Sequence, residues 1–247
     1  MRILFEKRFI MIKIIMEGRW WQKESLVKFP SPTTIMVCGP TGSGKTFLTK
    51  QILENADGMF MEKPCKIIIC YDTWQPMFDQ LMTNLKEVTF HQGLPNEEQF
   101  REWSDIDGHK ILVVDDCMAE GVNSTDLMKM FCVSSHHNNI TVMFLVQNIF
   151  QKGKVMRTLS LNTHFFLIFR SLRNKLQIET LARQIFVRNM SYFREAYEQS
   201  TSQRYSYLLI DISPHPPQVH IKGNTPLPPL RTRILPGEDT IVYVPRK

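Results

Sequence analysis

The chain has 247 residues, of which 43% are hydrophobic and 22% charged, and its formal net charge is +6. This composition excludes a disordered or fibrous protein and is sufficient for one α/β domain with a proper core. The basic balance favours a polyanionic partner such as DNA, although it is also common in proteins that bind no nucleic acid.

The amino-terminal segment is apolar but does not predict a membrane span. Residues 1–16 are interrupted by charged side chains, so we expect no transmembrane helix. A small-residue cleavage site is also missing, which argues against a secretory signal. Because Met11 and Met16 are alternative starts, we set residues 1–28 apart as an N-terminal extension.

The cysteine and histidine patterns predict no metal site. Five scattered cysteines fit neither a disulfide framework nor zinc binding, and we expect them to be buried, reduced thiols, Cys65 and Cys70 included. His136 and His137 are adjacent, and adjacent side chains diverge on a helix. A helix end explains this pair better than a metal site.

The first half of the chain alternates apolar segments with helical patterns. After the turn signal FPSP, residues 33–38 (TTIMVC) predict a buried strand, and residues 45–54 a helix. We expect a surface helix with an acidic first turn at 96–103, which suits the helix dipole. Further strands are expected at 66–71, 88–91 and 110–116.

The second half continues this alternation, with helices expected at 124–135, 175–186 and 192–198, and strands at 140–147, 164–170 and 205–212. Strands that are continuous apolar runs, separated by helices, predict an α/β domain at 29–212. Its sheet is expected to be mainly parallel, with helices on both faces. Frequent prolines predict an extended or disordered tail at 213–247.

Residues 39–46 (GPTGSGKT) match the pattern G-x-x-x-x-G-K-[ST] between a predicted strand and a predicted helix. Glycines let such a loop curl so that backbone N–H groups surround a phosphate, and the start of the helix adds positive potential. We expect Lys45 to reach the β- and γ-phosphates of ATP, and the Thr46 hydroxyl to coordinate Mg²⁺. The other expected nucleotide-binding residues are Gly39, Pro40, Thr41, Gly42, Ser43 and Gly44.

Two aspartates end the aliphatic segment KILVVDD, at the expected edge of the sheet. We assign Asp115 to the Mg²⁺ and Asp116 to the attacking water, with a cap of the next turn as the alternative for Asp116.

Gln147 ends the next predicted strand. It lies beside the γ-phosphate only if that strand is inserted between the strand before the glycine loop and the strand of Asp115. Such an insertion is typical of the additional-strand (ASCE, RecA-like) P-loop NTPases, in which a Gln can position water. The wide separation of Lys45 and Asp115 leaves room for it, and an ordinary polar strand end is the alternative.

Hydrolysis also requires positive charge on the transferred phosphoryl group, often an arginine of a neighbouring subunit. The candidates are Arg157, Arg170, Arg173 and Arg183. For each of these arginines, the alternative is a surface position or a contact with a phosphate backbone.

The ordered segments GPTGSGKT, ILVVDD, SSHHNNITVMFLVQNIF, KGKVMRTLSLNTHFFLIFR and LQIETLARQIF resemble the genome-packaging ATPases of the poxvirus type. They are most similar to the versions in Polinton (Maverick) elements and adintoviruses, within the FtsK/HerA superfamily. The similarity spans residues 29–212, and its most diagnostic part is HH-N-I-x-V … Q-N-x-F … K … R-T-x-S-x-N. Residues 34–46, Asp115, Asp116 and Gln147 match the family's Walker A, Walker B and downstream polar motifs.

This resemblance implies a homo-oligomeric ring that hydrolyses ATP and drives double-stranded viral DNA into a capsid, with a capsid or portal-type protein as partner. The implied location is intracellular, in the host nucleus or at a viral assembly site, or with the virion. Lys152, Lys154 and Arg157 follow Gln147 in a predicted loop, where they would contact DNA phosphates without reading sequence. A solvated charged loop is the alternative.

In one respect the chain differs from larger packaging enzymes. We expect little beyond the ATPase core, and we expect no nuclease and no separate DNA-binding domain. Two other classes stay open. A small-molecule kinase would need an arginine-rich lid, which the segment after Asp116 lacks. A non-hydrolysing, ATP-dependent scaffold would not need Asp115, Asp116 and Gln147 together.

Overall fold

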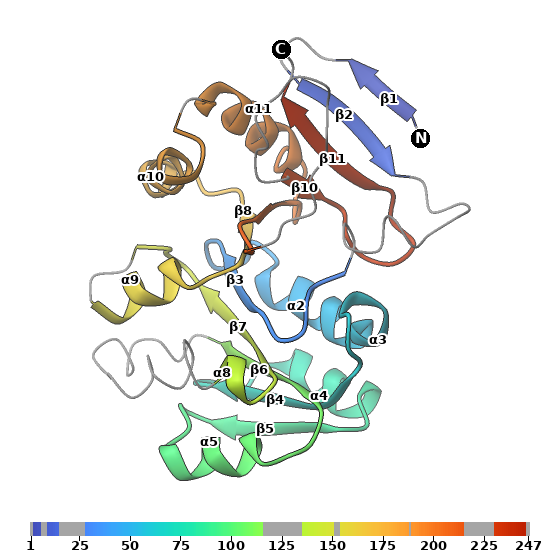
Figure 1. The fold of residues 1–247 in the computed structure, drawn as a ribbon, viewed down its shortest axis with the longest axis vertical. Helices are drawn as coiled ribbons and strands as arrows, with labels where there is room; N and C mark the ends of the chain where they lie inside the picture. Colours follow the sequence, from blue (N-terminus) through green and yellow to red (C-terminus); the bar gives the residue numbers. More distant parts are fainter. Residues whose placement is uncertain are drawn as a thin grey trace.

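The computed structural model describes residues 2–5, 9–14, 28–115, 135–150, 154–187, 189–214 and 230–245 (Figure 1). The strands are β1 (Arg2–Phe5), β2 (Phe9–Ile14), β3 (Thr34–Cys38), β4 (Pro64–Tyr71), β5 (Val88–Gln92), β6 (His109–Asp115), β7 (Ile140–Val146), β8 (Phe165–Phe169), β9 (Tyr207–Asp211), β10 (Leu230–Thr232) and β11 (Thr240–Pro245). The helices are α2 (Lys45–Glu54), α3 (Ala56–Met59), α4 (Pro76–Asn84), α5 (Glu97–Ser104), α8 (Ser135–His137), α9 (Lys154–Leu161), α10 (Lys175–Ile185) and α11 (Met190–Ser200).

One 11-stranded sheet runs through the described residues in the order β1-β2-β11-β10-β9-β8-β3-β7-β6-β4-β5. Strands β8, β3, β7, β6, β4 and β5 run parallel to one another. β7 pairs with β3 on one side and with β6 on the other. An additional strand therefore separates the strand before the glycine loop from the strand that ends at Asp115, which confirms the predicted fold class.

Helices cover both faces of this parallel part of the sheet. Alternate side chains of β3 point to opposite layers, with Met36 in one hydrophobic cluster and Val37 in the other. The first cluster includes buried side chains of α5, α9, α10 and α11, and the second includes those of α2, α3 and α4. Strands buried on both sides explain the continuous apolar segments in the sequence.

Beyond β8 the sheet continues through antiparallel strands, in the order β9, β10, β11, β2 and β1. β1 and β2 belong to the N-terminal segment, and β10 and β11 belong to the proline-rich segment after residue 213. The sequence did not predict these four strands. That the ATPase domain spans residues 29–212 stays a prediction. The sheet itself extends beyond both of these boundaries.

Most other elements lie where the sequence placed them, including α2 at residues 45–54 and the parallel strands. The sequence missed α4 and α9. The prediction that Lys154 and Arg157 lie in a loop is wrong, because both residues belong to α9. This helix forms because Met156 and Leu159, at helical spacing, pack into the core. Lys152 and residues 124–134 of the helix predicted at 124–135 lie outside the described residues.

None of the helices in the described ranges is long and apolar enough to cross a membrane.

Candidate functional site

The glycine loop at residues 39–46 joins β3 to α2, and its backbone explains why glycine occupies three positions. Gly42 and Gly44 have φ angles of +75° and +106°, which side chains disfavour. A Cβ on Gly39 would lie 2.7 Å from Ser43 Oγ and 2.8 Å from Phe169 Cβ, closer than real contacts allow. The loop can therefore curl tightly against β8 only with these glycines.

Positive charge is concentrated inside this loop. Lys45 Nζ donates to the carbonyl oxygens of Gly39 and Pro40, at 2.8 Å and 3.2 Å. α2 begins at Lys45 with no side-chain cap on its N-terminus and no acidic residue in its first turn. Its first N–H groups and its dipole are thus available to an anion.

A cavity of about 610 Å³ brings most of the predicted site residues together. Asp115 is 5% exposed. Asp115 and Gln147 lie at the same edge of the sheet because β6 and β7 are parallel neighbours. Asp115 ends β6, and Gln147 directly follows β7. The lining residues that the sequence predicted are Thr41, Gly42, Gly44, Lys45, Thr46, Asp115 and Gln147.

Gln75, which the sequence analysis missed, also lines this cavity. Its Nε2 donates to Asp115 Oδ2 at 3.1 Å, so it fixes one oxygen of that carboxylate. Gln75 precedes α4, and the segment before it is held by Trp74, whose ring packs on Tyr71 and Phe90 with centroids 5.3 Å and 5.1 Å away. No motif marks Gln75, because this aromatic packing rather than a local pattern places it.

A second cavity, of about 270 Å³, lies on the other side of the loop. It is lined by Pro40, Thr41, Gly42 and Ser43, and also by the exposed Arg170, which directly follows β8. Arg204 and Tyr205, which sequence reasoning also missed, line it too. Arg170 is therefore the candidate arginine that lies beside the glycine loop within one chain.

The other arginine candidates line neither of these two cavities. Arg157 and Arg173 are exposed, and Arg183 forms an exposed ion pair with Glu179 at 3.5 Å. Asp116 lies outside the described residues, so its role stays a prediction.

Cys38 lies directly behind the loop and is buried, which raises the pKa of its thiol to about 12 despite the opposing effect of Lys45. Its Sγ lies 3.9 Å from the carbonyl oxygen of Gln147, the acceptor of a weak hydrogen bond. Cys70 is also buried, as predicted, but the prediction is wrong for Cys65, which is exposed at the start of β4.

His136 and His137 lie in α8, whereas residues 124–134 of the helix predicted before them lie outside the described residues, so the helix-end interpretation stays a prediction. Within the described ranges, no three His, Cys, Asp or Glu side chains are grouped as a metal site would require.

The residues around the larger cavity fit a nucleoside triphosphate with Mg²⁺. The loop has a close-fitting curve that a Cβ on Gly39 would fill. Lys45 and the uncapped start of α2 offer positive charge to an anion. The Thr46 hydroxyl and the Asp115 carboxylate offer hard oxygen ligands to Mg²⁺. The buried Ser43 Oγ has no hydrogen-bond partner in the described part of the chain, which leaves it for a further polar group.

No protein-family model matches this sequence, and no curated protein matches it significantly. Among solved structures, B204, the DNA-packaging ATPase of Sulfolobus turreted icosahedral virus, has a TM-score of 0.52 at 11% identity, covering 73% of this chain and 93% of B204. B204 from Sulfolobus turreted icosahedral virus 2, in complex with AMP, has a TM-score of 0.49 at 13% identity, over 73% and 93%. The flagellar accessory protein FlaH of Methanocaldococcus jannaschii has a TM-score of 0.40 at 13% identity, over 63% and 78%.

The likeness to the first of these structures concerns the fold alone, and it agrees with the strand order and the glycine loop. The chain has the α/β fold of the additional-strand (ASCE) P-loop NTPases.

Proposed function

We propose that this chain is a DNA-stimulated ATPase that moves double-stranded viral DNA into a capsid. One observation supports the ATPase part above all others. Lys45, Thr46, Asp115 and Gln147 line a single cavity, and β7 lies between the strands that carry the glycine loop and Asp115.

The chain's own groups account for nucleotide binding. Backbone N–H groups of the loop and the start of α2 would bind the phosphates, with Lys45 on the β- and γ-phosphates. The Thr46 hydroxyl and the Asp115 carboxylate would hold Mg²⁺, with Gln75 orienting that carboxylate. When bound, the ion would neutralise developing negative charge on the phosphate oxygens.

Gln147 and Asp116 would act on the attacking water. Gln147 is exposed beside Asp115, where its amide can orient a water molecule in line with the terminal phosphate. Asp116 directly follows Asp115 and would accept the proton of that water. Asp116→Asn is therefore expected to bind ATP and to turn it over slowly.

The DNA-packaging part rests on the resemblance of the ordered motifs to viral packaging ATPases. B204, which is described as the DNA-packaging ATPase of its virus, shares the fold. A closed ring of identical subunits would bring Arg157 or Arg170 of one subunit to the nucleotide of the next. The capsid or portal-type partner, and the host nucleus or viral assembly site as the place of action, follow from the same resemblance.

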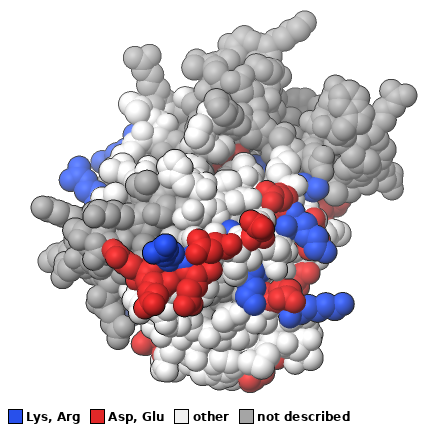
Figure 2. All heavy atoms as spheres, turned by 60° about the horizontal axis from the view of Figure 1, so that its bottom comes forward, with Lys and Arg blue, Asp and Glu red and all other residues white. Residues whose placement is uncertain are grey.

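DNA would approach a part of the surface other than the acidic one. Figure 2 shows acidic side chains gathered on the face that is turned forward from the bottom of Figure 1, where α5 and β5 lie. α5 contributes the exposed Glu97, Glu98 and Glu102, which would repel phosphates. Lys152, Lys154 and Arg157, around the start of α9, are the proposed contacts with the DNA backbone.

ATP hydrolysis measured with and without long duplex DNA, alongside particle mass in the presence of ATP, tests this proposal. We expect DNA to accelerate hydrolysis, and we expect ATP to favour an oligomer. A monomer whose hydrolysis is indifferent to DNA would contradict the motor, and phosphoryl transfer to a metabolite would identify a kinase instead.

Variants separate the roles of the basic residues. Lys152→Ala with Lys154→Ala should lose the DNA stimulation but keep DNA-independent hydrolysis, whereas Lys63→Ala, which removes an exposed lysine elsewhere, should change neither. If an arginine acts across a subunit interface, mixing inactive Arg170→Ala and Lys45→Ala proteins should restore part of the activity. Mixtures that stay inactive would argue against Arg170 in this role.

A further inference from the structure

Tyr205 has a backbone conformation that is unusual for an aromatic residue. Its φ angle is +64°, in the left-handed region, and its side chain is 50% exposed. This conformation costs an aromatic residue of the order of 1 kcal/mol, and such outliers gather at functional sites.

The segment that carries Tyr205 is anchored at both ends. Thr201, after α11, donates its N–H and its hydroxyl to the carbonyl oxygen of Tyr197, at 3.0 Å and 2.7 Å. Ser206 donates its hydroxyl to the carbonyl oxygen of Gln203 at 2.7 Å, and β9 begins at Tyr207. The exposed ring is therefore presented by a braced turn.

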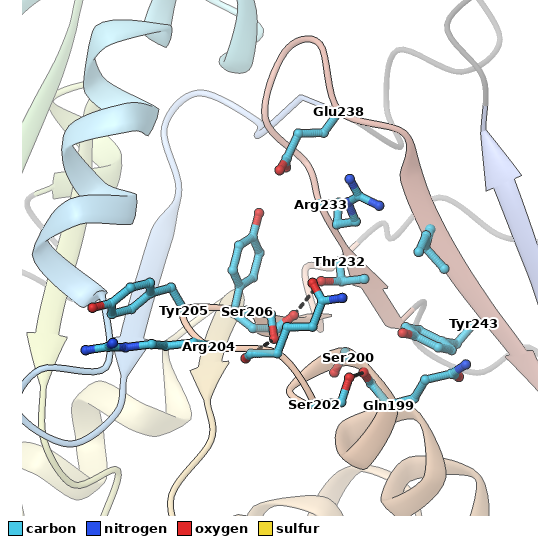
Figure 3. Close-up of a pocket in the computed structure, with 13 residues that line it drawn as sticks. Gln199, Ser200, Ser202, Arg204, Tyr205, Ser206, Thr232, Arg233, Glu238 and Tyr243 are labelled. Atoms are coloured by element: carbon cyan, nitrogen blue, oxygen red, sulfur yellow. Dashed lines mark hydrogen bonds between the residues drawn. The ribbon is translucent and has the colours of Figure 1, made fainter.

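The Tyr205 ring lies directly against the glycine loop. A Cβ on Gly44 would be 3.1 Å from Tyr205 Cδ1, a tight contact that a small shift of the ring would have to relieve. The Arg204 guanidinium carbon stacks over the same ring, 4.7 Å from its centroid. Figure 3 shows both side chains lying together beside the start of α2, at one end of the polar cavity that it displays.

A second exposed aromatic ring lines the same cavity as Lys45. Phe47, in the first turn of α2, is 50% exposed, and both Phe47 and Tyr205 line the cavity of about 610 Å³. Exposed rings that share a cavity with a phosphate-binding loop offer flat apolar surfaces to a flat ligand group.

The sheet order places Tyr205 at the opposite end of the cavity from Asp115 and Gln147. Asp115 and Gln147 follow β6 and β7, on one side of β3, whereas Tyr205 precedes β9, beyond β8 on the other side. A nucleotide whose terminal phosphate lies near Gln147 therefore extends its base toward Tyr205.

We infer that Phe47 and Tyr205 form the nucleobase site of this cavity, and that they hold the base of the bound nucleotide by stacking, with Arg204 bracing the Tyr205 ring. This inference rests on the proposed ATPase function, because it assumes that the phosphates bind in the glycine loop. Stacking depends on ring surface and tolerates different bases, so ATP and GTP should bind with similar affinity.

Calorimetric titration with Mg·ATP and with Mg·tripolyphosphate, which has neither base nor sugar, tests the site. In Tyr205→Ala and in Phe47→Ala, we expect ATP to bind about tenfold more weakly while tripolyphosphate binds as to the unmodified protein. Tyr205→Phe keeps the ring and should retain the ATP affinity. Leu176→Ala, which removes an exposed apolar side chain from α10, should change neither titration.

The outcomes separate the two proposals. Unchanged ATP affinity in both alanine variants, or an equal loss for ATP and tripolyphosphate, would overturn the base site and leave the ATPase proposal standing. If neither ligand binds the unmodified protein, the ATPase proposal itself fails.

Discussion

A side chain from a segment distant in the sequence orients the Asp115 carboxylate, since Gln75 Nε2 donates to Asp115 Oδ2 at 3.1 Å. This hydrogen bond restricts the orientation of the carboxylate beside the glycine loop. Gln75 is thus a positioning residue for the proposed Mg²⁺ site.

We expect Gln75→Ala to raise the Mg²⁺ concentration required for half-maximal hydrolysis and to lower kcat/KM about tenfold. The physical reason is the loss of a hydrogen bond to a charged group, which is worth about 1.5–3 kcal/mol. The measurement is a Mg²⁺ titration of ATP hydrolysis, with thermal unfolding as the control for structure. A Mg²⁺ requirement equal to that of the unmodified protein would show that Gln75 does not act through Asp115.

The buried Cys38 and the exposed Cys65 should react very differently with an alkylating agent. Burial raises the pKa of the Cys38 thiol to about 12, whereas Cys65 is exposed, with its Sγ 3.1 Å from the carbonyl oxygen of Asp107. With iodoacetamide at about pH 8, we expect Cys65 to be alkylated and Cys38 to react only after unfolding, as read by mass spectrometry of peptides. Modification of Cys38 in the folded protein at the rate of Cys65 would mean that β3 and β7 open behind the loop.

At the scale of elements, β6 and β7 share a buried histidine that couples stability to pH. His109 Nδ1 lies 2.8 Å from the carbonyl oxygen of Glu62, and Nε2 lies 2.8 Å from the Thr141 hydroxyl. The neutral ring satisfies both contacts by donating from Nδ1 and accepting at Nε2. Burial lowers the pKa of His109 from its ordinary value of 6.5, although the Glu62 carbonyl and carboxylate oppose this and Lys110 adds to it.

A lowered pKa means that the unfolded chain binds a proton before the folded chain does. The contribution of His109 is therefore complete above about pH 6.5 and is lost as the pH falls from there through the folded-state pKa. In urea unfolding at about pH 7.5 and pH 5.5, the free energy of unfolding should fall more for the unmodified protein than for His109→Gln. Equal losses in the two proteins would exclude His109 as the source.

The antiparallel strands contain a buried ion pair that ties β9 to β10. Arg231 donates to Asp211 Oδ2 at 2.5 Å, with 2% and 1% of their side chains exposed, and Ser213 donates its N–H and hydroxyl to Asp211 Oδ1. Asp211→Val should cost about 3–5 kcal/mol of stability, because it leaves a buried cation without its carboxylate.

The double variant Asp211→Val with Arg231→Leu should be less destabilised than Asp211→Val alone, in equilibrium urea unfolding. A double variant that is at least as unstable as the single one would mean that the pair is needed for more than mutual neutralisation.

The sequence predicted the parallel part of the fold because all its strands except β5 contain a continuous apolar run and α2 follows an unmistakable motif. It missed α4, whose nine residues bury only Phe78 and Leu81. It missed β10, which has three residues, and it missed the pairing of β11 with β2 from the far end of the chain. Short strands of this kind are determined by long-range pairing, which local patterns do not show.

The candidate site divides in the same way. Lys45, Thr46, Asp115 and Gln147 were predictable because they belong to motifs or to strand ends at one edge of a parallel sheet. Gln75, Arg204 and Tyr205 were not, since the loops that carry them reach the cavity only through tertiary packing.

At the scale of the whole molecule, the cavity lies where the two parts of the sheet meet. Its residues from sequence motifs belong to the parallel part, and Tyr205 belongs to the turn before β9, the first antiparallel strand. ATP hydrolysis is expected at that cavity, where the strand that ends at Asp115 and the strand before the glycine loop are separated by β7.

The most direct test is the steady-state rate of Mg·ATP hydrolysis by the unmodified protein and by Asp115→Asn, which preserves the shape of the side chain and removes its charge. We predict measurable hydrolysis for the unmodified protein and a loss of at least about a hundredfold in the variant, with the fold unchanged, because Asp115 would no longer hold the metal ion. Hydrolysis by Asp115→Asn at the rate of the unmodified protein would contradict the assignment of this cavity as the catalytic centre.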